Sequence, residues 1–163
     1  WIADHYVWLG LERTRPFLEF RLTQRMRALD LPVPRPVAAR VLRAGPTYTG
    51  DLITERLPAV PCSSLMAKRA LDAAGWRAAG ACVARCHGGG LDHADLTLNN
   101  LLLDGDGTAH LIDLDRAVLR APGRWAQANL ARLRRSLEKL TPDWTAAERD
   151  AAWREFMAGY SAR

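Results

Sequence analysis

The sequence is poor in lysine and cysteine, and it has no long apolar run. Only two of its 23 basic residues are lysines, Lys68 and Lys139, so the formal net charge of +5 comes from arginine. Its three cysteines are odd in number and lack a C-x-x-C pair, which argues against a disulfide framework or a zinc site and fits a reducing compartment. No apolar stretch approaches the roughly 18 residues that span a bilayer, so no transmembrane helix is expected.

The chain starts at Trp1 without a signal peptide, so we expect a fragment of a longer protein. Its 163 residues, 48% of them apolar, fit one domain or one domain plus part of another. Arginine-rich proteins often bind phosphate groups, but a solvated basic surface gives the same composition, so charge alone chooses no partner. The aromatic residues fall on expected core faces and form no stacking platform, which argues against nucleic-acid binding.

Periodicity and breaker residues predict a mixed α+β chain in which a helix and an antiparallel strand pair precede a mainly helical region. The last helix opens with a capping box formed by Thr145 and Glu148. The expected elements are a helix at 14–29, strands at 37–43 and 48–57, a linker at 58–64, a helix at 70–86, a hairpin of strands 101–103 and 109–112, a helix at 125–140 and a final helix after 145. A strand end is also possible at 6–9.

Apolar spacing along the helices predicts which side of each one faces the core. Small residues on one face of the 70–86 helix would let another helix approach closely, with Trp76 and Val83 off that face. The predicted core-facing residues are Leu18, Leu22, Met26 and Leu29; the small face Gly75, Ala78, Ala79, Cys82 and Cys86; then Leu130, Leu133, Leu137 and Leu140; and finally Trp153, Phe156, Met157 and Tyr160.

The acidic stretch Asp92–Asp115 organises the chain. It holds six of the 18 acidic residues and no lysine or arginine. Like charges repel unless something positive lies among them, and hard divalent cations prefer carboxylate and amide oxygens. Within the stretch, His93, Asp95 and Asn100 form an H-x-D-x-x-x-x-N pattern, and Asp113 follows in the apolar run L-I-D-L. This order is typical of the catalytic loop and metal-binding Asp of kinase-fold phosphotransferases.

Each member of this set has an expected role. Asp95 lies on a loop and is expected to orient an attacking hydroxyl and accept its proton. Asn100 begins the predicted hairpin and Asp113 ends it, so both side chains are expected to converge on one Mg²⁺ ion. His93 is expected to brace the loop rather than to move protons.

Other acidic residues have simpler interpretations. Asp104 and Asp106 are expected to be turn residues, because Asp and Gly favour tight turns and the later ligands of an EF-hand are missing. Asp115 is either a second metal neighbour or a partner of Arg116. Glu19 lies at the flank of the first helical stripe, where it is either exposed or paired.

Beyond these motifs, the chain resembles the 3-deoxy-D-manno-octulosonic acid (Kdo) kinases, within the wider group of lipopolysaccharide-core kinases. The resemblance covers most of the chain up to Arg116 and continues more weakly through the 125–140 helix. The stretches that carry it are ERTRPFLEFRL at 12–22, LPVPRPVAAR at 31–40, DLITERLP at 51–58, DHADLTLNNLLLD at 92–104 and LIDLDR at 111–116.

This resemblance implies an α+β, protein-kinase-like two-lobe fold that is truncated at its N-terminus. A partial N-lobe at 1–57, a hinge or linker at 58–64 and a C-lobe at 65–163 would follow. The implied reaction uses ATP and Mg²⁺ to phosphorylate a Kdo sugar hydroxyl on a lipid A precursor. The enzyme would be peripheral at the cytoplasmic face of the bacterial inner membrane, which is an anionic surface. The arginines of the 125–140 helix would either contact this surface or hold phosphates of the acceptor.

The resemblance also assigns nucleotide contacts. Glu19 matches the helix Glu that pairs with the phosphate-anchoring base of kinase folds. The stretch Thr54–Leu57, including Glu55 and Leu57, falls where the hinge holds adenine through backbone hydrogen bonds.

Several departures from protein kinases limit the assignment. Leu114 and Asp115 stand where Phe and Gly are usual, and Thr97 replaces a basic residue, which favours a non-protein acceptor. Neither lysine precedes Glu19 and no G-x-G-x-x-G loop is present, so we expect both functions upstream of Trp1. A heptose or aminoglycoside kinase, or an inactive kinase fold that serves as a binding module, remains an alternative.

Overall fold

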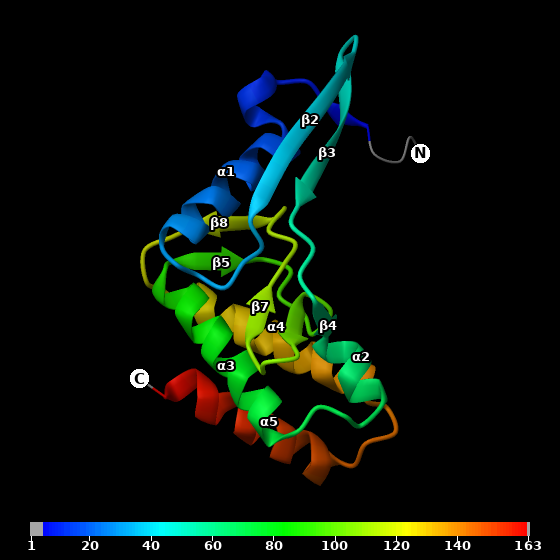
Figure 1. Ribbon diagram of the computed structural model, residues 1–163, viewed down its shortest axis with the longest axis vertical. Helices are drawn as coiled ribbons and strands as arrows, with labels where there is room; N and C mark the ends of the chain where they lie inside the picture. The colour runs from blue at the N-terminus through cyan, green and yellow to red at the C-terminus, as the bar shows by residue number, and fades with distance from the viewer. Residues whose placement is uncertain (1–4, 163) are drawn as a thin grey trace.

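The computed structural model describes residues 5–162. An antiparallel sheet and one helix form the upper part of the molecule in Figure 1, and helices with short strands form the lower part. The elements are β1 (Tyr6–Val7), the 3-10 helix η1 (Leu11–Arg13), α1 (Arg15–Ala28), β2 (Pro36–Ala44), β3 (Thr47–Thr54), β4 (Ala59–Pro61), α2 (Cys62–Ala67), α3 (Ala73–Gly88), β5 (Leu91–His93), β6 (Leu101–Asp104), β7 (Ala109–Leu111), β8 (Ala117–Leu119), α4 (Trp125–Leu140) and α5 (Ala146–Ser161).

The upper sheet has the order β1–β3–β2, all antiparallel, and α1 packs against β2 and β3 (Figure 1). The predicted helix and strand pair are therefore confirmed, and so is the short strand at the start. Tyr48 of β3 is buried, and its hydroxyl accepts a hydrogen bond from the Arg15 backbone N–H at 2.9 Å. That bond fixes the first turn of α1 to the sheet.

The predicted leucine stripe of α1 is wrong at two positions. Leu18 and Leu29 are 53% and 52% exposed, whereas Met26 is fully buried. The inward side of the helix instead carries Thr23 and the half-buried Glu19. One small sheet covers only part of a helix, and here α1 is rotated so that Glu19 and Thr23 face the protein together with Leu22 and Met26, whereas Leu18 and Leu29 do not.

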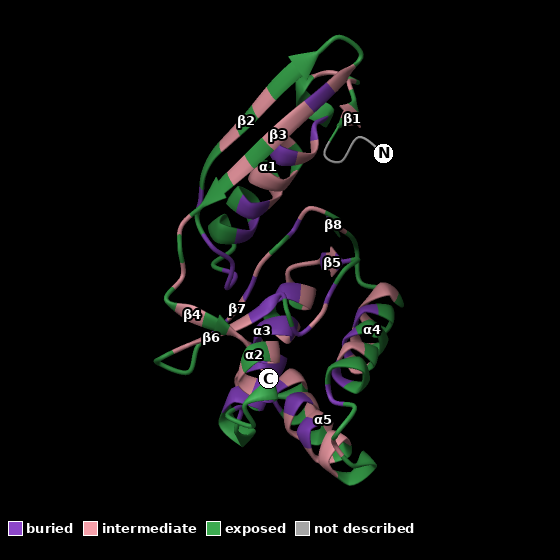
Figure 2. Cartoon of the chain, turned by 90° about the vertical axis from the view of Figure 1, so that its right-hand side faces the viewer, coloured by how far each residue is buried: buried purple, intermediate pink, exposed green. Residues whose placement is uncertain are grey.

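In the lower part, α3 and α5 pack closely through glycine. A Cβ atom at Gly80 would overlap the Phe156 carbonyl oxygen, and one at Gly159 would overlap the Arg77 carbonyl oxygen. A second helix thus approaches the 70–86 region closely, but through Gly80 and not through the predicted small face, whose Gly75 lies against Leu103 of β6. Trp76, expected off the small face, is also buried, on the side of α3 that carries α5. Both the β6–β7 strands and α5 pack on α3 (Figure 2).

The two short sheets of the lower part frame the acidic stretch. The hairpin of β6 and β7 pairs Leu101 with Leu111, as predicted, and β4 adds to it in the order β4–β6–β7. β4 occupies residues that we expected to be an unstructured linker. The ends of the stretch are joined by a β5–β8 pair that was not predicted, because each strand has three residues and neither shows a period.

The remaining helices largely match their predicted core residues. Leu133 and Leu137 of α4 and Phe156 of α5 are buried, and the Thr145–Glu148 capping box is present. Leu140 is 37% exposed, because it ends α4. The three cysteines are buried free thiols, as expected. Among the helices of residues 5–162, none is both long and apolar enough to cross a membrane.

Candidate active site

The loop after β5 is held together by hydrogen bonds among the predicted site residues. The Asp95 backbone N–H donates to Nδ1 of His93 at 3.3 Å. The Asp95 carbonyl accepts from Nδ2 of Asn100 at 3.1 Å. His93 and Asn100 are buried, but the Asp95 side chain is exposed. The loop backbone is therefore fixed while the carboxylate remains open to a ligand.

Ile112 connects this loop to Asp113. Its backbone N–H donates to the Asn100 carbonyl at 2.9 Å, and its carbonyl lies 3.2 Å from Nε2 of His93. Asp113 follows directly, with a φ of 61° in the left-handed region that few non-glycine residues adopt. Such strain persists only where neighbouring contacts enforce it, and it gathers at functional sites. The two bonds to Ile112 supply those contacts.

The contacts of His93 define its chemical state. Since Nδ1 accepts from the Asp95 N–H, Nε2 carries the proton and donates to the Ile112 carbonyl. Burial lowers the pKa of His93, which keeps the ring neutral. Both nitrogens are occupied, so this geometry supports the predicted bracing role.

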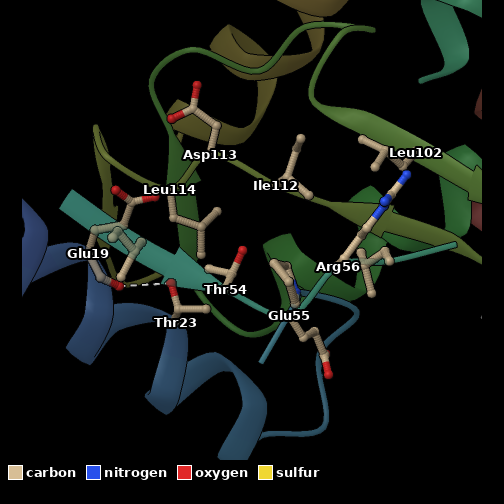
Figure 3. Close-up of a pocket in the computed structure, with 12 residues that line it drawn as sticks. Glu19, Thr23, Thr54, Glu55, Arg56, Leu102, Ile112, Asp113 and Leu114 are labelled. Carbon is tan, nitrogen blue, oxygen red and sulfur yellow. Dashed lines mark hydrogen bonds between the residues drawn. The ribbon is translucent and has the colours of Figure 1, made fainter. Parts of the chain in front are cut away.

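Glu19 and Asp113 line one cavity of about 440 Å³ between α1, β3 and the β6–β7 hairpin. Figure 3 shows both acids toward one end of it and Glu55 and Arg56 toward the other. Burial raises the pKa of Glu19, and the nearby Asp113 charge raises it further, against a hydrogen bond from the Leu114 N–H. Two carboxylates facing one cavity favour the binding of a cation.

The predicted hinge segment lies along the same cavity. Thr54, Glu55 and Leu57 line it. The Glu55 carboxylate accepts a hydrogen bond from the Arg35 backbone N–H at 2.6 Å. The Glu55 backbone N–H donates a hydrogen bond to the Arg35 carbonyl at 2.8 Å. Within residues 5–162 no hydrogen bond uses the Glu55 carbonyl or the Leu57 N–H. A planar ring with an adjacent donor and acceptor can bind these two backbone groups.

The comparisons with known proteins agree with this geometry. A model of the "Lipopolysaccharide kinase (Kdo/WaaP) family" matches residues 2–160. The chain belongs to this family. It is 46% identical to a 3-deoxy-D-manno-octulosonic acid kinase of Xanthomonas campestris pv. campestris over 158 residues, covering 96% of this chain and 64% of that protein. A protein of the same name from Stenotrophomonas maltophilia is 48% identical over 141 residues, 84% of this chain and 55% of that one.

The fold is shared with a solved structure. The crystal structure of WbdD, described as a bifunctional kinase-methyltransferase, matches 98% of this chain and 41% of its own chain, with a TM-score of 0.57 at 15% identity. The predicted Kdo/WaaP family membership and kinase-like fold are confirmed. The chain spans less than two thirds of the length of the curated relatives it matches.

The predicted donors, Asn100 and Asp113, carry the oxygen ligands that hard divalent cations prefer. Within residues 5–162 no three His, Cys, Asp or Glu side chains gather closely enough to hold a metal ion. The Asn100 amide nitrogen is used by the Asp95 carbonyl, which leaves its Oδ1 oxygen available as a ligand. One carboxylate, from Asp113, and one amide oxygen suit Mg²⁺, which keeps several waters and takes further oxygens from nucleotide phosphates.

Asp115 pairs with Arg15 and not with Arg116, which was one of its two predicted roles. It forms an ion pair with Arg15 at the start of α1, with Nε to Oδ1 at 2.7 Å. Arg15 lies 100 residues away in sequence, so no local spacing signals this pair. Asp92 pairs with Arg120 at 2.8 Å and Asp104 with His110 at 3.0 Å. Two of the six acids of the stretch, Asp92 and Asp115, are thus neutralised by arginines, and Asp104 is hydrogen-bonded to His110.

Asp104 has the turn role that we predicted. Its Oδ1 accepts from the backbone N–H groups of Asp106 and Thr108 at 3.0 and 2.8 Å.

Three basic residues of α4 line a cavity together with Asp95, which the sequence did not predict. They are Arg132, Arg135 and Lys139. Their helical spacing was visible, but nothing local linked them to Asp95.

Proposed function

We propose that this chain carries the catalytic centre of an ATP-dependent kinase that phosphorylates a hydroxyl of a Kdo sugar. The observation that carries the proposal is the link from His93 to Asp95, Asn100 and, through Ile112, to Asp113. It fixes the backbone of Asp95, whose carboxylate is exposed, relative to the backbones of Asn100 and Asp113. Relatives named 3-deoxy-D-manno-octulosonic acid kinases support this choice of acceptor.

Each residue has a proposed role. Asp95 accepts the proton of the attacking hydroxyl and orients it, and His93 braces the loop. Asn100 and Asp113 hold Mg²⁺, which offsets phosphate charge when it is bound. Glu19 orients the nucleotide end of the cavity by pairing with a cation there. The backbones of Glu55 and Leu57 hold adenine.

The proposal also specifies the acceptor molecule and the location in the cell. We infer a lipid A precursor that bears Kdo, phosphorylated at the cytoplasmic face of the inner membrane. The net charge of +5 supports a peripheral association with anionic lipid. Residues 1–57 would then form part of an N-lobe and residues 65–163 a C-lobe, with the cavity of Glu19 and Asp113 between them.

The test is phosphate transfer from ATP to a Kdo-bearing lipid by the full-length protein. Asp95→Asn keeps the size and the backbone contacts of the loop but removes the base, so transfer should fall by about 10²–10⁴-fold. The melting temperature should not change. Asp106→Asn, in the exposed turn, is the matched control and should keep full activity.

Three outcomes would redirect the proposal. Undiminished transfer by Asp95→Asn would remove Asp95 from its role. No thermal shift with Mg–ATP would favour an inactive kinase fold that binds a partner. Transfer to a heptose or an aminoglycoside, with none to Kdo, would keep the reaction and change the acceptor.

A further inference from the structure

A second cavity, of about 360 Å³, lies between the Asp95 loop and α4. The two cavities share no lining residue, and Asp95 belongs to the second. The loop supplies Asp95, Thr97 and Asn99 to this cavity, and α4 supplies Arg132, Arg135, Ser136, Lys139 and Leu140. If Asp113 marks the nucleotide side of the site, this cavity is the side from which a hydroxyl reaches Asp95.

The basic residues form one face of α4. Arg132, Arg135 and Lys139 stand at positions i, i+3 and i+7, so they project to the same side of the helix. Ser136 lies among them, and its hydroxyl accepts a hydrogen bond from the Leu98 backbone N–H at 3.3 Å. Ser136 therefore anchors this face of α4 to the Asp95 loop and fixes the distance between the cations and the carboxylate.

In the described part of the chain, these cations have no protein partner. Within residues 5–162, no ion pair or hydrogen bond uses the side chains of Arg132, Arg135 or Lys139. Arg134, on the opposite side of the same helix, pairs with both Glu138 and Asp150. Three like charges that converge on one cavity repel each other, and an anionic ligand relieves that repulsion.

We propose that Arg132, Arg135 and Lys139 form a subsite that binds an acidic group of the acceptor while Asp95 receives its hydroxyl. The inference rests on the proposed kinase function and adds the determinant of acceptor choice. The acidic group is a carboxylate or a phosphate near the reacting hydroxyl. A sugar acid offers the first and a phosphorylated lipid the second, and arginine binds both through paired N–H groups.

The test uses the full-length protein with Arg132→Ala, Arg135→Ala, Lys139→Ala and the triple variant. Each single variant should raise KM for the Kdo-bearing acceptor about fivefold, and the triple about a hundredfold, because each loses one charge-assisted contact in a partly exposed groove. KM for ATP and the melting temperature should not change. Arg154→Ala, an exposed arginine on α5, removes the same charge elsewhere and should change neither constant.

Altered acceptors identify the bound group. Two altered acceptors are compared, one with the Kdo carboxyl converted to a methyl ester and one with the lipid phosphates removed. The acceptor that lacks the bound group should already have a raised KM with the unmodified protein. With that acceptor the triple variant should lose little more. Equal losses with every acceptor, or no loss with any, would overturn the subsite.

A binding titration separates this proposal from the proposed function. If no phosphate is transferred, yet the unmodified protein binds the Kdo-bearing acceptor and the triple variant does not, the subsite stands without the reaction. Equal binding by both proteins overturns it. Loss of binding to plain phosphatidylglycerol vesicles, with acceptor KM unchanged, would also overturn it and assign this face of α4 to the membrane surface.

Discussion

Glu19 and Asp113, which are 94 residues apart in the sequence, line one cavity. Burial raises the pKa of Glu19, and the charge of Asp113 raises it further. The fold therefore holds two acidic groups near each other. Their repulsion lowers the stability of the protein, and a bound cation would remove that repulsion. The same cavity is lined by Thr54, Glu55 and Leu57, the segment that we propose holds adenine.

Replacing Asp113 by Asn separates function from stability. Phosphate transfer by the full-length protein should fall at least about 100-fold, because a carboxylate ligand contributes several kcal/mol through the metal. The free energy of unfolding should not fall, because Asn tolerates a positive φ and the repulsion of Glu19 is removed. Kinase assays and urea denaturation, with Asp106→Asn as the control, measure both. A clear loss of stability would contradict this account of Asp113.

The Arg15–Asp115 ion pair should stabilise the contact of α1 with the segment after β7. A double-mutant cycle with Ala at both positions should give a coupling of about 1 kcal/mol, because the Asp115 side chain is only 18% exposed. The exposed Arg40–Asp51 pair, at 66% and 57%, should give less than about 0.5 kcal/mol. Equal coupling energies from denaturation would show that burial does not strengthen the first pair.

Replacing glycine by alanine should have different effects on stability at two positions of α3. Gly80→Ala should lower the free energy of unfolding by about 1–3 kcal/mol or more, because its Cβ would overlap the Phe156 carbonyl. Gly88→Ala, in the same helix with nothing within 4 Å, should leave stability unchanged or raise it by up to about 1 kcal/mol. Denaturation curves of both variants check this, and matching losses would refute the packing argument.

His87 should make stability depend on pH. Its ring lies between Trp125 and Tyr160, and burial lowers its pKa to about 4. The unfolded chain takes up a proton near pH 6.5 and the folded chain does not, so the stability present above pH 6.5 is lost as the pH falls toward 4. The loss is at most about 3 kcal/mol, and less because the ring is partly exposed.

Unfolding free energies of the parent and of His87→Phe, measured from pH 7.5 to 4, test this assignment. The variant should show a shallower fall with pH in that window. His93, whose pKa burial also lowers, contributes a slope of the same sign in both proteins. Identical slopes would mean that His87 is not the group responsible.

The sequence by itself determined the long elements and the order of the site residues along the chain. The spacing of His93, Asp95 and Asn100, and the hairpin ended by Asp113, are local features, because turns and strand pairing over a dozen residues follow from nearby residue types. Family membership could be read from the same stretches. Helix and strand periodicity located the long elements, and it missed β4, β5 and β8, which are too short to show a period.

Only the tertiary structure decided how these elements face one another. The rotation of α1 that exposes Leu18 and turns Glu19 inward depends on the sheet it packs against. The pairing of Asp115 with Arg15 and the placing of Arg135 beside Asp95 join residues far apart in the chain. Such contacts follow from packing of whole elements, which fixes helix rotation and distance, and no local spacing in the sequence encodes either.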